Sequence, residues 1–175
     1  ATVGAQNVVG PIYSAVGRTW QSTAQEREYD TELLVRHLSS LAAYARSKGV
    51  VLCVEPLNRF ETSFLNTVEQ AITVIDRVDS PACGLLLDTF HMNIEERSLG
   101  TAIRAAGDRV RHFHASENDR GTPGAGHIPW QEAADALRAI DYSGPVVIET
   151  FTDKVTTIAA AAAIWRPLAE SQDGV

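Results

Sequence analysis

Cysteine is scarce in this sequence, since only Cys53 and Cys83 occur among its 175 residues. Both lie inside or beside apolar runs, and their spacing matches neither a zinc site nor a disulfide framework. We interpret them as buried thiols of a protein from a reducing compartment, and we therefore expect a cytoplasmic location. Cys53 has no basic partner nearby in the sequence, so we interpret it as core filling and not as a nucleophile.

The sequence also has no excess of basic residues over acidic ones. The 15 Lys and Arg residues face 22 Asp and Glu residues, which gives a formal net charge of −7. This balance disfavours nucleic-acid binding, and the charges of both signs are spread along the chain without a basic arm. No apolar segment reaches the roughly 18 residues that a membrane span needs. No signal peptide is visible, and because the chain begins at Ala1 without a methionine, we expect that its start has been processed or trimmed.

The sequence does contain a regular alternation of helices and strands. A capping box of Thr67 and Gln70 opens one helix, and Gly49 follows the end of another. The predicted helices are 30–49, 67–78, 98–107, 129–140 and 154–168, and the predicted strands are 50–55, 84–88, 110–114 and 145–150. A further strand over 7–13 is less regular, because Pro11 lacks a ladder donor. Apolar strands separated by helices indicate a parallel sheet with helical crossovers.

Two architectures fit this alternation, an open doubly wound sheet and a (β/α)₈ TIM barrel. No GxGxxG motif follows a strand and no P-loop is present, which removes two common reasons for the open sheet. The length and the 45% hydrophobic content favour one domain with one core. We therefore expect an α/β fold of the barrel type.

Four apolar runs, VVLCVE, GLLLD, VRHFH and PVVIE, end in a polar residue: Glu55, Asp88, His114 and Glu149. In a barrel, the carboxyl ends of all strands share one rim, so these side chains would converge there. Three converging carboxylates would raise each other's pKa unless a cation were present. Carboxylate-rich sites with one imidazole suit Mn²⁺, Mg²⁺ or a similar ion. The alternative is that they are helix N-caps or strand-end ion pairs.

Further polar residues follow these strands in loops. Glu61 comes after Glu55, His91 after Asp88, and Arg120 lies in the glycine-rich stretch SENDRGTPGAGHIPW. This stretch is either an ordinary βα loop or a substrate loop with Arg120 as a hydrogen-bonding clamp, and the active rim of a barrel favours the second interpretation. We expect His112 to be a hydrogen-bonded core histidine and His37 to lie at the surface of its helix.

The stretches VEPLNRFE, LLLDTFHMN, HFHASENDRGTPGAGHIPW and VVIETF resemble the ketose 3-epimerases. This family includes the D-tagatose, D-psicose (D-allulose) and L-ribulose 3-epimerases, within the xylose-isomerase-like sugar isomerase superfamily. The resemblance runs from about residue 8 to the last helix. It implies a TIM barrel, an isomerase and a homodimer or homotetramer.

The resemblance also implies roles for seven residues. The residues implied to bind one divalent ion, Mn²⁺ first and Co²⁺ or Mg²⁺ as alternatives, are Glu55, Asp88, His114 and Glu149. Glu55 and Glu149 would also be the catalytic acid/base pair. The residues implied to contact O1 to O3 of a ketose are Glu61, His91 and Arg120.

The chain departs from the family in its number of units. The four strand-end residues are spaced by 33, 26 and 35 residues, so eight such units would need about 250 residues, the usual size of this barrel. Residues 1–175 therefore resemble units four to eight of one partial barrel domain. In the family, the absent units carry part of the pocket wall. The preferred sugar is therefore harder to predict from this sequence than the chemistry of the reaction. We expect two unpaired sheet edges, at 7–13 and 146–150.

We predict metal-dependent epimerisation at C3 of a free ketohexose or ketopentose, with the ketose as a small-molecule partner. An aldose–ketose isomerase such as hydroxypyruvate isomerase shares the metal core, but the long ENDRGTPGAGH loop favours the epimerases. An endonuclease IV-like nuclease needs several metals and more than the five histidines present, and the negative charge opposes it. The last alternative is a non-catalytic barrel fragment.

Overall fold

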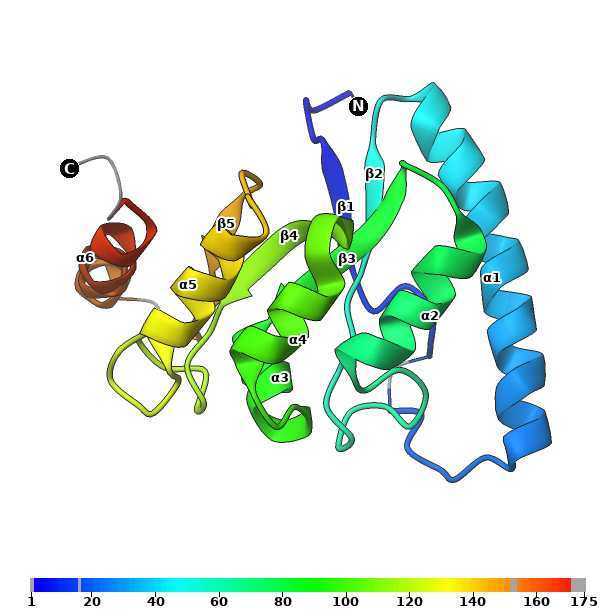
Figure 1. Ribbon diagram of the computed structural model, residues 1–175, viewed down its shortest axis with the longest axis horizontal. Helices are drawn as coiled ribbons and strands as arrows, with labels where there is room; N and C mark the ends of the chain where they lie inside the picture. Colours follow the sequence, from blue (N-terminus) through cyan, green and yellow to red (C-terminus); the bar gives the residue numbers. More distant parts are fainter. Residues whose placement is uncertain (1, 16, 152–153, 171–175) are drawn as a thin grey trace.

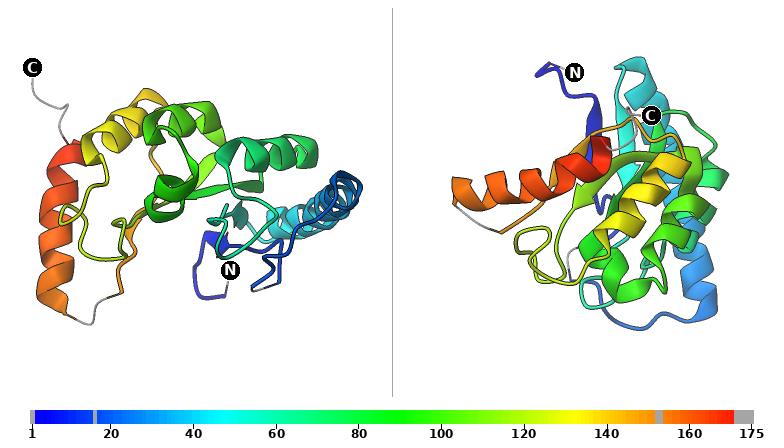
Figure 2. Two further views of the ribbon diagram at one scale, coloured as in Figure 1. Left: turned by 90° about the horizontal axis from the view of Figure 1, so that it is seen from below. Right: turned by 60° about the vertical axis from the view of Figure 1, so that its left-hand side comes forward.

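Five parallel strands form one curved sheet in the computed structural model, which describes residues 2–15, 17–151 and 154–170. The strands lie in chain order, and every neighbouring pair is parallel. Their bounds are β1 (Asn7–Gly10), β2 (Val51–Val54), β3 (Cys83–Asp88), β4 (Val110–Ala115) and β5 (Val146–Ile148). The helices form an arc around the convex side of the sheet (Figures 1 and 2). The fold is therefore a partial TIM barrel, as predicted, and the open doubly wound sheet is excluded.

The predicted helices are present, with changes at their ends. The α-helices of the described chain are α1 (Ala24–Ser47), α2 (Val68–Val78), α3 (Thr89–Glu95), α4 (Leu99–Ala106), α5 (Trp130–Ala139) and α6 (Val155–Glu170). The capping box of Thr67 and Gln70 is confirmed. Helix α1 begins before the predicted start, because Thr23 and Glu26 form a second capping box that the sequence analysis did not identify.

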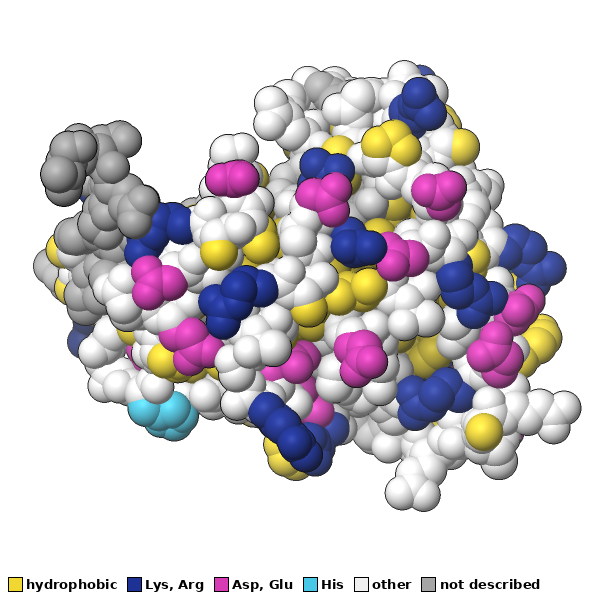
Figure 3. Space-filling view, in the orientation of Figure 1, with side chains coloured by type: hydrophobic (Ala, Val, Ile, Leu, Met, Phe, Trp, Pro, Cys, Tyr) yellow, Lys and Arg dark blue, Asp and Glu magenta, His cyan; other side chains and the backbone are white. Residues whose placement is uncertain are grey.

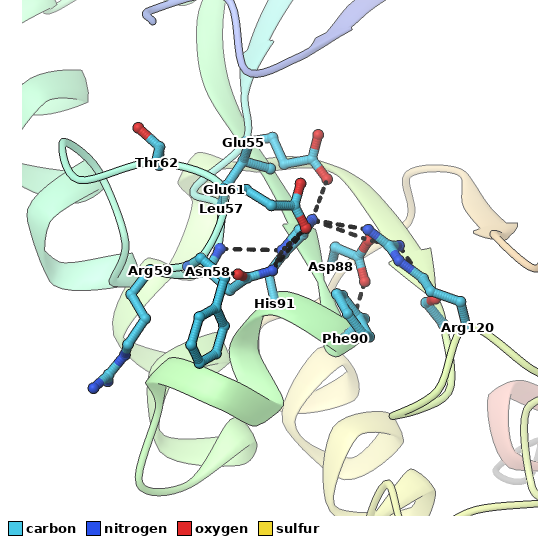
Figure 4. Close-up of polar contacts among 12 residues, drawn as sticks. Glu55, Leu57, Asn58, Arg59, Glu61, Thr62, Asp88, Phe90, His91 and Arg120 are labelled. Carbon is cyan, nitrogen blue, oxygen red and sulfur yellow. Dashed lines mark hydrogen bonds and ion pairs between the residues drawn. The ribbon is translucent and has the colours of Figure 1, made fainter. Parts of the chain in front are cut away.

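Helix α3 was not predicted. It follows β3 without a loop, because the Asp88 side chain accepts a hydrogen bond from the Phe90 N–H at 2.7 Å and so caps the helix. Helix α3 has only seven residues, which is too short for a clear helical period. It carries His91 to the rim of the sheet (Figure 4).

The core lies between the sheet and its helices. Leu85 and Leu87 of β3 are fully buried, and Phe113 of β4 stacks on Trp165 of α6 with ring centroids 6.0 Å apart. Burial of each such side chain stabilises the fold by roughly 1.5–3 kcal/mol. Gly84 permits close contact between β3 and β4, since a Cβ there would lie 2.7 Å from the Arg109 carbonyl oxygen. The core thus fixes the strands whose ends carry the predicted site.

The two outer strands, β1 and β5, do not pair with each other, so the sheet has two open edges, as expected. Val9 pairs in register with Cys53, and Val147 pairs with His114, so both valines lie on the concave face of the sheet. Val9 is 36% exposed and Val147 is 41% exposed. The concave face therefore presents apolar side chains beside its two edges.

The surface over the helices is mixed in charge. Figure 3 shows Lys and Arg side chains interspersed with Asp and Glu across this face, without a large patch of one sign. Within the described part of the chain, no helix is long and apolar enough to cross a membrane. His37 is exposed on α1, as predicted.

Candidate active site

Four strand-end residues meet at one rim of the sheet. Glu55 follows β2, Asp88 ends β3, His114 lies in β4, and Glu149 follows β5. One ligand atom from each residue lies within 4.8 Å of the others. Asp88 and His114 are direct neighbours in the register of β3 and β4, which explains their common face. We call these four residues the strand-end cluster.

The carboxyl groups of Glu55 and Asp88 are buried, with 7% and 1% of each residue exposed. Burial raises the pKa of Glu55 to about 7, and the nearby Glu149 adds to this effect. Burial also raises the pKa of Asp88, and its contact with Glu149 acts in the same direction. Without a bound cation, the cluster therefore retains protons near neutral pH. A divalent ion bound there would take the place of these protons.

His114 supplies a nitrogen that fits a cation ligand. Its Nδ1 is buried and has no hydrogen-bond partner in the described part of the chain. It lies 3.5 Å from Glu149 Oε2 and 3.9 Å from Asp88 Oδ2. A buried ring nitrogen without a partner among carboxylate oxygens is costly unless it binds something. With three carboxylates, it makes a donor set that suits Mn²⁺ or Mg²⁺ better than structural zinc.

His112 lies one position deeper on the same face of β4. Its ring packs edge-on against that of His114, with centroids 5.1 Å apart. His112 is half-buried and not fully buried as predicted for a core histidine, and its Nδ1 has no hydrogen-bond partner among the described residues. His112 supports the His114 ring by packing and lies outside the strand-end cluster.

Arg120 reaches the strand-end cluster from the loop after β4, as Figure 4 shows. Its Nη1 donates to Asp88 Oδ2 at 2.6 Å and also contacts Glu149 Oε2. Its guanidinium lies over the ring of Phe90, 4.2 Å from the centroid. His114, Asp88 and Arg120 together hold the pKa of Glu149 well below its usual range. Arg120 is therefore the cation closest to this site in the structure.

Glu61 and His91 lie beside the strand-end cluster on other segments. His91 is 2% exposed, and its Nε2 is 3.8 Å from Glu55 Oε1 and 2.9 Å from Arg120 Nη2. Burial, together with the charge of Arg120, lowers the pKa of His91 to about 4. Glu61 Oε1 lies 4.0 Å from His91 Nδ1. The structure thus brings all seven predicted site residues to one rim.

Glu117, which is 1% exposed in the loop after β4, was not among the predicted site residues. Its carboxylate accepts hydrogen bonds from Gly124 N, Ile128 N and Trp130 Nε1 at 2.7 to 3.0 Å. Burial alone would raise the pKa of Glu117, but these bonds lower it. Glu117 therefore holds together the loop that carries Arg120. The available signal was an acidic residue at the start of a glycine-rich loop, which needs an internal acceptor for its N–H groups.

Asn58, in the loop after β2, was also missed, and it is 1% exposed. Its Nδ2 donates to Glu61 Oε1 at 2.8 Å and lies 2.9 Å from His91 Nδ1. Asn58 therefore links two predicted substrate residues. No local pattern indicates this role, because His91 is distant in the sequence.

Comparison with known proteins extends these observations. The family model described as xylose isomerase-like TIM barrel matches residues 1–171. The D-psicose 3-epimerase of Enterocloster bolteae is 43% identical over 143 residues, which cover 82% of this chain and 48% of the relative. The L-ribulose 3-epimerase of Methylomonas sp. (strain DH-1) is 34% identical over 173 residues, which cover 98% of this chain and 59% of the relative.

A solved structure agrees with these relatives. The crystal structure of D-psicose 3-epimerase with D-tagatose from Clostridium cellulolyticum H10 superposes with a TM-score of 0.79 and 38% identity, and the match covers 96% of this chain and 58% of that one. The chain thus spans about half to three fifths of the length of the relatives it matches. The matching family model, the parallel half-barrel and the similarity to these epimerases agree, and the chain belongs to the xylose isomerase-like TIM barrel family.

Proposed function

We propose that this chain carries the catalytic part of a ketose 3-epimerase, an isomerase that inverts C3 of a free ketohexose or ketopentose. The observation that carries the proposal is the strand-end cluster, in which two glutamates from different strands lie within 4.8 Å of each other, among residues suited to a metal. The similarity to D-psicose and L-ribulose 3-epimerases supports the choice of reaction.

The two glutamates have environments suited to opposite proton-transfer roles. Glu149 is held in its ionised form, since its pKa lies well below the usual range. In the metal-free chain, burial raises the pKa of Glu55 to about 7, so this carboxyl group takes up a proton more readily than Glu149 does. In this proposal Glu149 takes a proton from one face of C3, and Glu55 delivers one to the other face. The reverse reaction exchanges the two roles.

The residues that would hold a divalent ion are Glu55, Asp88, His114 and Glu149. The partnerless Nδ1 of His114 and the raised pKa values of Glu55 and Asp88 support this assignment. When bound, such an ion supplies Lewis-acid stabilisation of the negative charge that develops on substrate oxygens. We propose Mn²⁺ first, with Co²⁺ or Mg²⁺ as alternatives.

The substrate would lie against Glu61, His91 and Arg120. Arg120 and His91 offer N–H donors to the oxygens near C1 to C3, and Glu61 offers an acceptor to a hydroxyl. Arg120 also contacts Asp88 and Glu149, so it stands where it can compensate negative charge beside the reacting carbon. A small neutral ketose fits such a polar rim, whereas nucleic acid does not fit the net charge of −7.

The assembly and location of the protein are part of the proposal. We propose a cytoplasmic homodimer or homotetramer, in which residues 1–175 act as units four to eight of a barrel domain. Activity assays should therefore use the chain alone and the chain supplied with the first three βα units of a relative. If only the supplemented protein turns over a ketose, the chain alone is the non-catalytic fragment considered above.

Reaction in D₂O tests the proposed chemistry. A 3-epimerase places deuterium at C3 of the product ketose and leaves hydrogen at C1, because the returning proton comes from a glutamate that can exchange its proton with solvent. An aldose–ketose isomerase places deuterium at C1 or C2 and yields an aldose. Deuterium at C1 together with an aldose product would transfer the assignment to the isomerases.

A further inference from the structure

Asn58 lies buried between Glu61 and His91 (Figure 4). Its side-chain amide makes three contacts: Oδ1 with Phe60 N at 2.9 Å, Nδ2 with Glu61 Oε1 at 2.8 Å, and Nδ2 with His91 Nδ1 at 2.9 Å. Its backbone N–H also donates to His91 Nδ1, at 3.1 Å. One residue thus makes both hydrogen-bond contacts at this ring nitrogen.

The orientation of the Asn58 amide follows from its neighbours. The backbone N–H of Phe60 can only donate, so the amide atom that faces it must be the oxygen. The carboxylate of Glu61 requires a donor, which places the NH₂ group on the other side. Since both neighbours demand the same orientation, the NH₂ group also faces His91.

Two donors therefore point at His91 Nδ1, the Asn58 backbone N–H and the Asn58 NH₂ group. A neutral imidazole has one protonated nitrogen and one acceptor nitrogen. We propose that Asn58 is a positioning residue that fixes His91 as the neutral tautomer with its proton on Nε2.

In this tautomer the contact between His91 Nε2 and Arg120 Nη2 is not a hydrogen bond. An Nε2–H group cannot accept a hydrogen bond, so it and Arg120 Nη2, 2.9 Å away, are two donors facing each other. Two donors of Asn58 face Nδ1, whereas a single donor of Arg120 faces Nε2, so we assign the proton to Nε2. In this assignment the Nη2 group of Arg120 has to shift away from Nε2, while Nη1 keeps its contact with Asp88. The His91 Nε2–H is then free to donate toward the space beside Glu55, whose Oε1 lies 3.8 Å away.

The inference deepens the proposed function, and its catalytic meaning rests on that proposal. His91 would give a hydrogen bond to a carbonyl or hydroxyl oxygen of the ketose. It would not act as a base, because its inward nitrogen already carries a proton and Asn58 covers the other. Proton transfer at carbon is then left to Glu55 and Glu149.

Nitrogen-15 NMR of the histidine rings in the intact, metal-free protein tests the tautomer directly. The expected spectrum shows the protonated-nitrogen shift at His91 Nε2 and the lone-pair shift at Nδ1. The opposite pattern, with the proton on Nδ1, would overturn the proposal. This measurement on the unmodified protein stands even if every variant fails to fold.

Two matched variants then test the part played by Asn58. Asn58→Asp replaces the NH₂ donor with a carboxylate oxygen, which should draw a proton onto Nδ1 and move His91 away from the Nε2–H form. Asn66→Asp makes the same change in the same loop, where Nδ2 donates to Leu57 O and Thr62 O. Asn66→Asp should leave the His91 spectrum as in the parent. Equal spectra for the parent and Asn58→Asp would show that Asn58 does not fix the tautomer of His91.

Kinetics with a ketose separate this inference from the proposed function. The loss of one donor to the substrate should raise KM of Asn58→Asp about tenfold or more, with a smaller effect on kcat. A kcat loss with KM unchanged would contradict the role of His91 as a ground-state donor. An Nε2–H ring in a protein that epimerises no ketose would refute the function alone, and an Nδ1–H ring in an active epimerase would refute the inference alone.

Discussion

Glu55 and Glu149 follow strands β2 and β5, which two other strands separate, and yet a carboxylate oxygen of each belongs to the same 4.8 Å cluster. The curvature of the sheet brings them together, because in a flat sheet strands lie about 4.8 Å apart and three such steps would exceed this distance. Two carboxylates that approach from separated strands can address opposite faces of one carbon atom.

The first prediction concerns this pair. Glu149→Gln keeps the shape of the side chain and removes its basicity, so activity should fall by about 10²–10⁴-fold or more. Steady-state kinetics measure the loss, and metal binding is measured on the same sample. Glu69→Gln, at an exposed position on helix α2, is the matched control and should keep parental activity. If Glu149→Gln retained more than about a tenth of the activity with metal bound, Glu149 would not be a base.

The second prediction concerns metal binding. Calorimetric titration with Mn²⁺ should show one ion per chain, and His114→Ala should weaken binding by more than about 100-fold, since loss of supporting partners alone costs 10- to 100-fold. His37→Ala removes an exposed histidine of helix α1 that lies outside the cluster, so it should retain most of the affinity. Equal affinities in these two variants would contradict the proposed ligand set.

The third prediction concerns the stability of the metal-free protein. The pKa of Glu55 is raised from its ordinary value to about 7 in the folded chain. Such a carboxyl group favours folding most when it is neutral, at a pH below its ordinary pKa, and this contribution is lost as the pH rises through 7. The raised pKa of Asp88 acts in the same direction, whereas the lowered pKa of Glu149 acts only at more acidic pH.

The free energy of unfolding should therefore fall by on the order of 3 kcal/mol between about pH 5 and pH 8 because of Glu55 alone. Chemical denaturation in the presence of a chelator measures this change. Glu55→Gln should flatten the slope, and added Mn²⁺ should reverse it. A stability that rises with pH in the chelated protein would show that Glu55 is not titrating as described.

The fourth prediction concerns the loop after β4. Glu117→Ala leaves the N–H groups of Gly124, Ile128 and Trp130 without their acceptor. The donors of Ile128 and Trp130 are buried, and each unsatisfied buried donor costs about 1–3 kcal/mol, so the free energy of unfolding should drop by about 2 kcal/mol or more. Asp119→Ala removes only an exposed bond to Gly121 N and serves as the control. Equal denaturation midpoints for the two variants would contradict the role of Glu117.

The fifth prediction concerns the open edge at β1. Val8 is 48% exposed and Val9 is 36% exposed on this strand, which pairs with β2 on one side only, and its open edge invites edge-to-edge association of the chain alone. Val9→Lys should reduce self-association in sedimentation experiments. Val3→Lys, at a position that is 89% exposed before the strand, should leave it unchanged. Identical sedimentation of all three proteins would show that the edge is not the contact.

The strand ends could be predicted because an apolar run that stops at a charged residue is a local pattern. Glu55 and Asp88 were found in this way before their positions in space were known. Asn58 and Glu117 could not be found, because their roles depend on hydrogen bonds whose partners are set by the tertiary fold. Helix α3 was not predicted for another reason: it has only seven residues, and its start depends on the Asp88 side chain, for which an N-cap was the alternative to a metal ligand.

The two carboxylate oxygens of Asp88 have different hydrogen-bond partners. Oδ1 accepts from the Phe90 N–H, and Oδ2 faces Arg120 and the strand-end cluster. A cation that draws electron density from Oδ2 weakens the acceptor at Oδ1, because both oxygens share one delocalised charge. The amide proton of Phe90 is therefore an intrinsic reporter, whose chemical shift and hydrogen-exchange rate record whether the site is occupied without any added label.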